Sequence, residues 1–264
     1  MMFALSPLAI VAVPVALETV KATRHDTVER EANNEAAAEA ERMAKGRKPR
    51  ASGAPASPQV SRANKADIRA ILGASGSGKT TYVMQQLRED KPDRLLIWDT
   101  KGEFSQEGYA APVRSISELV AAVRKSEKWK LALIPYGSPN ERRKLFDMFA
   151  ALAFAAGRCT VVAEEISGVA VGGKINAPGW QDIINRGRTY GLTVYALSQR
   201  PALMDKETLG NASLIRCGRP AWKADAKIMA DCLFVGSDEL LSLQDLEFVQ
   251  RQKGLTLRGV VHPE

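Results

Sequence analysis

A glycine-rich segment is the feature that most restricts what this 264-residue chain can fold into. It follows an apolar run at residues 68–72 and precedes a helix-compatible run at residues 81–87. A strand, a glycine-rich turn and a helix in this order form an anion-binding device, because small residues let backbone N–H groups approach a phosphate. The segment reads Gly73, Ala74, Ser75, Gly76, Ser77, Gly78, Lys79, Thr80.

This segment fits the pattern G-x-x-x-x-G-K-[ST], in which the lysine and the hydroxyl have defined partners. Lys79 is expected to reach the outer phosphates of a nucleoside triphosphate, and the Thr80 hydroxyl to bind Mg²⁺. We therefore expect ATP and Mg²⁺ as cofactors. A flexible serine-glycine loop is the alternative, but it does not explain the flanking strand and helix patterns. The residues expected to bind nucleotide are Gly73, Ala74, Ser75, Gly76, Ser77, Gly78, Lys79, Thr80 and Thr81.

Composition divides the chain into three parts. Residues 1–25 begin with an apolar run broken by Pro7 and Pro14, which is too short and too interrupted for a spanning helix. We expect this segment to be an anchor to a membrane or a partner protein, or else a docked or disordered tail. Residues 26–65 combine a charged, helix-compatible run with a basic linker rich in Pro, Gly and Ser. Residues 66–264 are expected to form the globular domain.

Charge and cysteine usage exclude some classes of site. The net charge of +7 is compatible with a polyanionic partner such as DNA but does not identify one. The three cysteines are far apart and show no C-x-x-C spacing, which argues against a disulfide framework and against a zinc site. The compartment is therefore expected to be reducing.

Short apolar runs alternate with helical patterns along the globular part. Strands are expected at residues 94–99, 131–134, 159–164, 192–198 and 213–217. Helices are expected at residues 116–123, around an apolar stripe at residues 145–152, and at residues 180–190, where Gly191 would cap the end. This alternation predicts an α/β fold with a mainly parallel sheet and helices on both faces. Residues 248–251 and 255–260 could add a C-terminal hairpin.

Two acids end the apolar run at residues 160–163, and they are the candidates for hydrolytic chemistry. A carboxylate at the end of a buried strand is costly unless it has a partner. Glu164 is expected to steer the metal near Thr80, and Glu165 to orient or deprotonate the attacking water. In such pairs the first acid is normally Asp, and Glu164 reaches one methylene farther. The alternative is a solvated pair of acids at a strand end.

Three further segments carry a resemblance to a known family. They are residues 96–104 (LIWDTKGEF), residues 186–192 (RGRTYGL), and residues 194–201 (VYALSQRP), which end a strand with Ser-Gln-Arg-Pro. Taken in order with the glycine-rich loop, they resemble the HerA/FtsK superfamily of DNA-pumping P-loop ATPases, which have the additional-strand (ASCE) type of sheet. The resemblance covers residues 67–260. A compact ATPase domain with a short apolar amino terminus is most similar to the genome-packaging ATPases of tailless, membrane-containing double-stranded DNA phages.

The resemblance implies roles for residues outside the loop. Gln199 would be the polar sensor that reads the γ-phosphate from the strand beside the loop. Arg186 or Arg188 would be inserted into a neighbouring subunit's site, where an arginine that contacts the transferring phosphoryl group accelerates hydrolysis by about 10³ to 10⁵. Arg200 and Arg219 are weaker candidates. The alternative for each arginine is a solvated side chain at a helix end.

The resulting expectation is an ATP-hydrolysing motor that packages double-stranded DNA into a phage capsid without reading its sequence. The resemblance implies a homo-oligomeric ring, a hexamer, with a membrane or capsid-vertex partner for the amino-terminal segment. Its expected location is the host or cell cytoplasm, at a membrane or at a virion vertex. The loop at residues 168–179, which contains Lys174, is a candidate for contacting DNA, and equally a plain surface turn.

Three other functions remain open from the sequence. A Zot-like ATPase of filamentous-phage assembly would export single-stranded DNA through a membrane, although the spanning helix expected after its ATPase domain is not evident here. A small-molecule kinase shares the phosphate loop but gives no reason for the acidic pair together with Gln199. A nucleotide-dependent switch protein would hydrolyse slowly and without regard to DNA.

Overall fold

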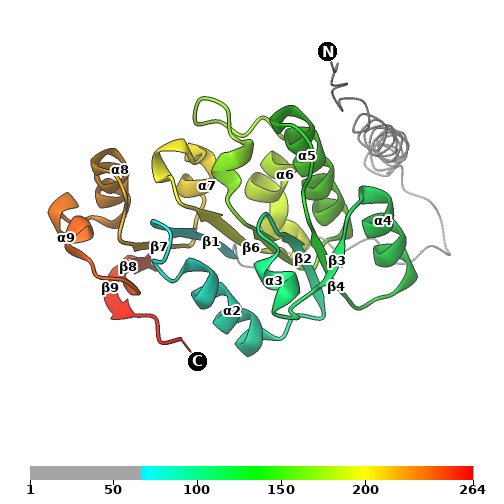
Figure 1. Ribbon diagram of the computed structural model, residues 1–264, viewed down its shortest axis with the longest axis horizontal. Helices are drawn as coiled ribbons and strands as arrows, with labels where there is room; N and C mark the ends of the chain where they lie inside the picture. Colours follow the sequence, from blue (N-terminus) through cyan, green and yellow to red (C-terminus); the bar gives the residue numbers. More distant parts are fainter. Residues whose placement is uncertain (1–66, 264) are drawn as a thin grey trace, which may run out of the picture.

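The computed structural model describes residues 67–263, and in this part of the chain the strands form a single nine-stranded sheet. Figure 1 shows the sheet edge-on in the middle of the domain, with helices above and below it. The strands in chain order are β1 (Asp67–Leu72), β2 (Arg94–Trp98), β3 (Ala111–Val113), β4 (Trp129–Leu133), β5 (Thr160–Ala163), β6 (Thr193–Ser198), β7 (Leu214–Gly218), β8 (Glu247–Gln252) and β9 (Leu255–Val260).

The spatial order of the strands is β3-β4-β2-β5-β6-β1-β7-β8-β9. Neighbouring strands from β3 to β7 are parallel, whereas β8 and β9 are antiparallel and form a hairpin at one edge. Strand β6 lies between β1, which leads into the glycine-rich loop, and β5, which leads into the acidic pair. This insertion defines the additional-strand type of P-loop sheet, so the predicted fold class and the predicted hairpin are both confirmed.

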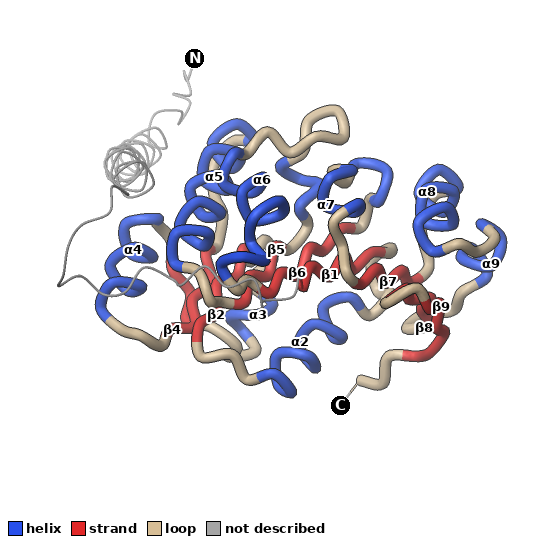
Figure 2. Tube along the Cα trace, turned by 180° about the vertical axis from the view of Figure 1, so that it is seen from behind, coloured by secondary structure: helices blue, strands red, loops and turns tan. Residues whose placement is uncertain are grey.

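Helices cover both faces of the sheet, but unequally (Figure 2). On one face lie α2 (Lys79–Asp90) and the short α3 (Glu103–Gln106), whose buried side chains pack with those of the strands in one apolar cluster. The opposite face carries the larger apolar cluster and the helices α4 (Ile116–Lys125), α5 (Pro139–Ala156), α6 (Pro178–Arg186), α7 (Lys206–Gly210), α8 (Lys223–Leu233) and α9 (Ser237–Ser242). Single 3-10 turns occur at Ile166–Val169, Gly187–Tyr190 and Pro201–Leu203.

An aromatic group forms the centre of the larger cluster. The Trp98 ring lies 5.1 Å from the Phe146 ring and 5.8 Å from the Phe149 ring, and Phe146 also contacts Trp180 at 5.4 Å. All four side chains are fully buried, and burying one such side chain stabilises the fold by about 1.5–3 kcal/mol. These contacts fix α5 and α6 against β2, and thereby fix the strand end that leads to the functional site.

Most of the predicted elements are present, and one boundary is wrong. The helix expected at residues 180–190 ends at Arg186 and continues as a 3-10 turn to Tyr190. Gly191, with φ of 69°, caps that turn and not the α-helix, because the backbone tightens before it reaches the glycine. Strand β3 and helices α3, α7, α8 and α9 were not predicted.

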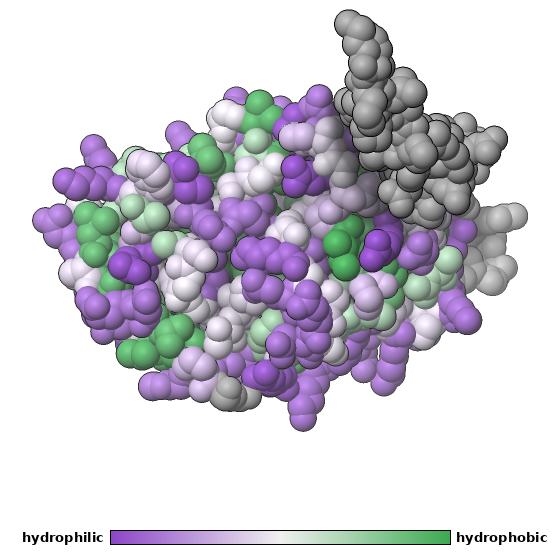
Figure 3. All heavy atoms as spheres, in the orientation of Figure 1, coloured by the Kyte–Doolittle hydropathy of each residue, from purple (hydrophilic) through white to green (hydrophobic). Residues whose placement is uncertain are grey.

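The amino-terminal segment and the linker predicted at residues 1–65 lie outside the described residues. Within residues 67–263, none of the helices has the length and apolar character needed to span a bilayer. Figure 3 shows that hydrophilic residues cover most of the face it presents, with hydrophobic residues in separate small patches.

Candidate nucleotide-binding site

The glycine-rich loop adopts a backbone that requires its glycines. Gly73, Gly76 and Gly78 have φ values of 135°, 78° and 80°, which residues with side chains rarely adopt. The loop also packs closely on the end of β7, because a Cβ at Gly73 would lie 2.7 Å from Ser77 Oγ and 3.1 Å from the Gly218 backbone. The loop is therefore held in one shape by both its own sequence and its neighbours.

Lys79, the first residue of α2, folds back over this loop. Its Nζ donates hydrogen bonds to the carbonyl oxygens of Gly73 at 2.8 Å and Ala74 at 2.7 Å. The pKa of Lys79 is lowered to about 8, mainly by burial and in part by the charge of Lys101, while Glu165 and Glu164 oppose the shift. A partly desolvated cation inside a loop of backbone N–H groups is suited to bind an anion.

Glu165 is held in a strained backbone conformation at the end of β5. Its φ of 50° lies in the left-handed region, which costs a residue other than glycine of order 1 kcal/mol or more. Its carboxylate accepts a hydrogen bond from the Gln199 backbone N–H, at 3.2 Å to each oxygen, and another from the Ser167 hydroxyl. Because Gln199 directly follows β6, the carboxylate connects the two strand ends that carry the predicted base and the predicted sensor.

Glu164, the preceding acid, points into a different set of partners. It is only 2% exposed, and its Oε2 accepts from Thr100 Oγ1 at 2.8 Å and from the Lys101 backbone N–H at 3.1 Å. Its Oε1 accepts no hydrogen bond but lies 3.3 Å from Lys101 Nζ. A buried carboxylate oxygen without a hydrogen bond is suited to a cation, so the residues fit Mg²⁺ as far as Glu164 is concerned.

The predicted loop residues and Gln199 line one cavity of about 200 Å³, and the two acids adjoin this lining through Glu164 with Lys101 and Glu165 with Gln199. From the loop and α2 it is lined by Ser75, Gly76, Gly78, Lys79, Thr80 and Thr81, and from other elements by Lys101, Glu103, Gln199 and Leu246. Gly73, Ala74 and Ser77 lie behind this lining and support the loop. The opposite arrangement, in which Gln199 and Glu165 lie across the sheet from Lys79, is excluded by this lining and by the bond between Glu165 and Gln199.

Lys101 and Glu103 were not among the predicted site residues. They follow β2, which pairs with β5 so that Trp98 lies opposite Ala163, and this pairing brings Lys101 beside Glu164. The signal in the sequence was the run of charged residues directly after a buried strand, since the carboxyl ends of parallel strands share one edge of the sheet. Within residues 67–263, there is no group of three or more His, Cys, Asp or Glu residues that could hold a metal ion.

Arg186 and Arg188 lie away from this cavity. They belong to the turn that leads into the start of β6, whereas the cavity surrounds the far ends of β1, β5 and β6. Arg186 is paired with Asp182 at 2.9 Å, and its guanidinium lies over the rings of Phe154 and Tyr190. The hydrogen bond that Arg186 donates to Asp182 raises the pKa of Arg186. Arg188 is exposed. Neither arginine is positioned to act in its own subunit's cavity.

Two weaker arginine candidates are tied to nearby acids. Arg200 pairs with the fully buried Asp225 at 3.1 Å, and Arg219 pairs with Asp245 at 2.7 Å. The backbone of Arg219 also supports the loop, because its carbonyl accepts the Ala74 N–H at 2.8 Å. Both therefore have structural partners near the site.

The loop after the acidic pair ends in a tight turn. Val171 and Lys174 pair through their backbones, and Gly172 and Gly173 between them have φ values of 58° and 74°. Val171 is 51% exposed and Lys174 is exposed. The loop between β5 and α6 projects beyond the helices of its face in Figure 1. It leaves the sheet directly from Glu165, so the site and the turn are parts of one connection.

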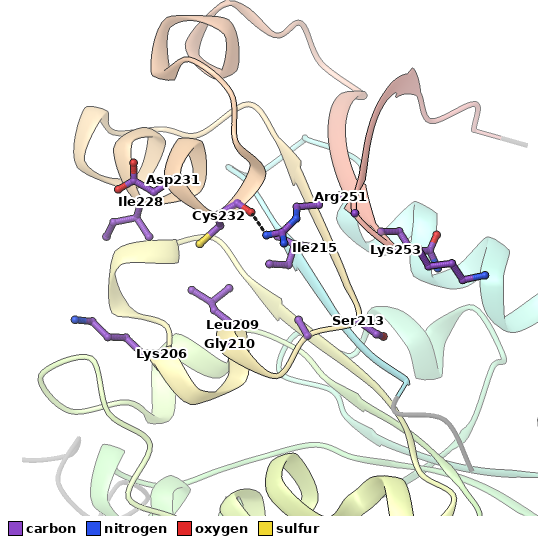
Figure 4. A pocket seen from close by; sticks show the side chains of 13 residues that line it. Lys206, Leu209, Gly210, Ser213, Ile215, Ile228, Asp231, Cys232, Arg251 and Lys253 are labelled. Carbon is purple, nitrogen blue, oxygen red and sulfur yellow. Dashed lines mark hydrogen bonds between the residues drawn. The ribbon is translucent and has the colours of Figure 1, made fainter. Parts of the chain in front are cut away.

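A second and larger cavity, of about 630 Å³, lies beside the start of β7 and the turn between β8 and β9 (Figure 4). Its apolar floor contains Leu209, Ile215 and Ile228, and Arg251 Nη1 beside it donates to the Cys232 carbonyl at 2.9 Å. None of the predicted site residues lines it. The larger cavity is therefore not the one that the motifs in the sequence indicate.

Comparisons with known proteins bear on the family and the fold of this chain. No protein-family model matches the chain. Over 191 residues it is 31% identical to Protein P9 of Pseudoalteromonas phage PM2, which covers 69% of this chain and 82% of P9. Its fold is similar to the genome packaging NTPase B204 from Sulfolobus turreted icosahedral virus 2 in complex with AMPPCP, with a TM-score of 0.58, 17% identity and coverage of 75% of this chain and 98% of B204. It is also similar to VirB4 of Thermoanaerobacter pseudethanolicus, with a TM-score of 0.59, 9% identity and coverage of 74% and 89%.

Proposed function

This chain belongs to the family of Protein P9 of Pseudoalteromonas phage PM2, and on that premise we propose that it is an ATP-hydrolysing motor that packages double-stranded DNA into a virus capsid. The similarity in fold to a genome packaging NTPase of another virus supports the same function. One observation carries the proposal: the phosphate loop and Gln199, which follows the inserted strand, line one cavity, and the Gln199 backbone holds the strained acid Glu165.

The binding step uses the loop and the first turn of α2. The backbone N–H groups of the residues that line the cavity, at 75–76 and 78–81, and the ammonium of Lys79 hold the β- and γ-phosphates of ATP. Lys79 exchanges its bonds to the carbonyls of Gly73 and Ala74 for bonds to phosphate oxygens. The Thr80 hydroxyl and Glu164 would hold Mg²⁺, which would supply neutralisation of charge on the phosphates.

The hydrolytic step uses Glu165 and Gln199. Glu165 accepts a proton from the attacking water, because its carboxylate is fixed by the Gln199 N–H and the Ser167 hydroxyl. The Gln199 side chain lines the cavity and contacts the γ-phosphate. Since the Gln199 backbone also holds the base, loss of the γ-phosphate is transmitted to Glu165 and to the loop that follows it.

A ring completes the site. Arg186 and Arg188 lie near the start of β6, at the opposite end of the strands from the cavity, so neither reaches ATP in its own subunit. One of them acts in the site of a neighbouring subunit, and ATP turnover then requires assembly. We assign a homo-hexamer. Double-stranded DNA passes through the ring and contacts the turn at Lys174 through its phosphates, without sequence preference.

The amino-terminal residues 1–25 would attach this ring to a membrane or to a capsid-vertex protein. The motor then acts in the host cytoplasm or at the virion vertex. The kinase alternative is less well supported, because Glu165, already hydrogen-bonded to the strand that carries Gln199, is placed to activate water.

ATP turnover, measured against protein concentration with and without double-stranded DNA, tests the proposal. We expect turnover per subunit to rise with concentration and with double-stranded DNA more than with single-stranded DNA. Lys79→Ala and Glu165→Gln should each lower turnover by at least about 100-fold, because one removes a phosphate contact and the other the base. Lys125→Ala and Glu127→Gln change the same residue types at exposed positions and should leave turnover unaltered.

Two outcomes would contradict the proposal. Turnover that is independent of both concentration and DNA would remove the motor. Wild-type rates in Lys79→Ala and Glu165→Gln together would remove the catalytic assignment.

A further inference from the structure

Glu164 has a buried carboxylate whose two oxygens differ: one accepts two hydrogen bonds, and the other has a single cation as its partner. Thr100 and the Lys101 backbone donate to Oε2, while Oε1 has only Lys101 Nζ, at 3.3 Å. The Glu164 side chain is 3% exposed. Because an ionised carboxylate in such a place needs a compensating charge, the ammonium of Lys101 is the cation that the structure places beside it.

Lys101 has an alternative to this pairing. Its side chain is 41% exposed, and its Nζ also lies 3.7 Å from Glu103 Oε1. Lys101 and Glu103 both line the cavity that contains Lys79 and Thr80. The carboxylate is fixed in the fold, whereas the ammonium is at the end of a flexible chain and can move between Glu164, Glu103 and the cavity.

A divalent cation and an ammonium cannot both occupy the free side of one carboxylate oxygen. Mg²⁺ binds carboxylates at about 2.0–2.1 Å, with water as the usual further ligand, and an ammonium at 3.3 Å occupies that space and opposes the charge of the ion. We infer that Lys101 is a stand-in cation for Glu164: it balances the carboxylate before Mg²⁺ and nucleotide bind, and Mg²⁺ displaces it toward Glu103 and the phosphates. This inference rests on the proposed function, in which Mg²⁺ and ATP bind at this cavity.

The displacement would give the site a safeguard. With Lys101 on Glu164, a divalent ion without nucleotide has to expel an ammonium that has no phosphate to receive it. When nucleotide arrives with the ion, the displaced ammonium gains phosphate oxygens as partners. Lys101 therefore makes metal binding depend on nucleotide binding, and it acts as a positioning residue and not as a catalytic one.

The test uses Mn²⁺ alone as the probe, without nucleotide, and measures the midpoint of thermal unfolding. We expect Mn²⁺ at millimolar concentration to raise the midpoint of the wild-type chain by less than about 1 °C, and that of Lys101→Met by at least about 3 °C. The double variant Lys101→Met/Glu164→Gln should lose that response. Lys128→Met is the matched control, because Lys128 pairs with Asp93 at 3.1 Å on the surface, where both side chains are mostly exposed.

Equal Mn²⁺ shifts in the wild type and Lys101→Met would overturn the inference, as would a shift that persists in the double variant. Should Lys101→Met not fold in metal-free buffer, refolding it in Mn²⁺ decides: recovery supports the inference, and failure with metal contradicts it. The outcome is separate from that of the proposed function, because no nucleotide is present and no hydrolysis is measured. A chain that never hydrolyses ATP would still show the metal response.

Discussion

The two ends of helix α2 carry buried charges that are satisfied to different degrees. At its last residue, Asp90, the helix meets Arg69 of β1, whose guanidinium bonds Asp67 at 2.8 and 2.9 Å, Gln86 at 3.2 Å and the Tyr195 hydroxyl. Asp90 is 3.5 Å from the same guanidinium. Burial alone would lower the pKa of Arg69, but these partners together raise it.

At the first residue of α2 the balance is reversed. Lys79 has only carbonyl acceptors, and burial lowers its pKa to about 8. Around it, one oxygen of Glu164, one oxygen of Asp99 and the Ser77 hydroxyl are buried without a hydrogen bond. The difference teaches that a set of partly buried charges with complete partners fixes the fold, whereas an incomplete set marks a candidate place for a charged ligand.

The largest effect is expected where the phosphate loop meets the first residue of α2. A methyl group at Gly218 would lie 2.7 Å from Ser77 Cβ and 3.0 Å from the Ser77 carbonyl oxygen. Gly218→Ala should therefore displace the loop and weaken ATP binding by about 10- to 100-fold, which corresponds to an overpacking cost of about 1–3 kcal/mol. Isothermal titration with a non-hydrolysable ATP analogue measures this change.

Gly236→Ala is the matched control, because a Cβ there would meet nothing within 4 Å and the φ of Gly236 is −75°. Equal affinities in the two variants would show that the loop tolerates movement and would break the contrast between the two helix ends.

The next effect concerns the far end of α2. Arg69→Met leaves two carboxylates without their partner, and it should lower the free energy of unfolding by about 1–2 kcal/mol. This value is below the range for a fully buried pair because the Asp67 and Asp90 side chains are 33% and 47% exposed. Thermal unfolding should show a midpoint about 3–6 °C lower, with ATP turnover unchanged at a permissive temperature. A loss of turnover without a loss of stability would assign this cluster to function.

The smallest effect is a dependence of nucleotide binding on pH. Below pH 8 Lys79 is charged in the free protein, and above it Lys79 becomes neutral, whereas bound phosphates favour the charged form. Affinity for the ATP analogue should therefore fall about threefold between pH 7.5 and 8.5, with proton uptake on binding. Stability has the opposite sign: the folded pKa lies below the value of 10.5 expected in the unfolded chain, so the free protein gains stability as pH rises from 8 to 10.5.

Titration calorimetry in two buffers of different ionisation enthalpy measures the proton uptake. The Arg69 cluster should contribute no slope in this range, because its pKa is raised and the guanidinium stays charged. An affinity that is constant to pH 9 would mean that Lys79 is as fully paired as Arg69.

Local sequence was sufficient for the parts of the site that are contiguous in the chain. The loop at residues 73–80 needs glycines because of its φ angles, and the acids Glu164 and Glu165 end a strand whose apolar character is plain. The hairpin of β8 and β9 was likewise visible from two alternating runs around Lys253 and Gly254. In each case the residues that decide the structure are neighbours in sequence.

The order of strands was not available from local patterns. Lys101 and Glu164 are 63 positions apart in the chain, and they meet because β2 pairs with β5. Apolar runs in a sequence predict strands but not which strands pair. Helix α8 has several small and polar residues among its apolar ones, so the apolar periodicity in its sequence is weak. Its apolar side becomes evident only from its packing against α9 and β8. The turn at Gly187–Tyr190 tightens through contacts with the start of the sheet, which a periodicity cannot show.

The close approach of the hairpin to the phosphate loop affects how the protein is made. Leu246 lines the cavity, and Leu246 and Val261 both lie within 3.4 Å of where a Cβ on Gly78 would be. Val261 is fixed there by its N–H bond to the Leu246 carbonyl at 2.9 Å. A nascent chain that has left the ribosome only through β7 thus holds the residues proposed to contact phosphate yet lacks one wall of the cavity, so we expect tight ATP binding only after the hairpin is made.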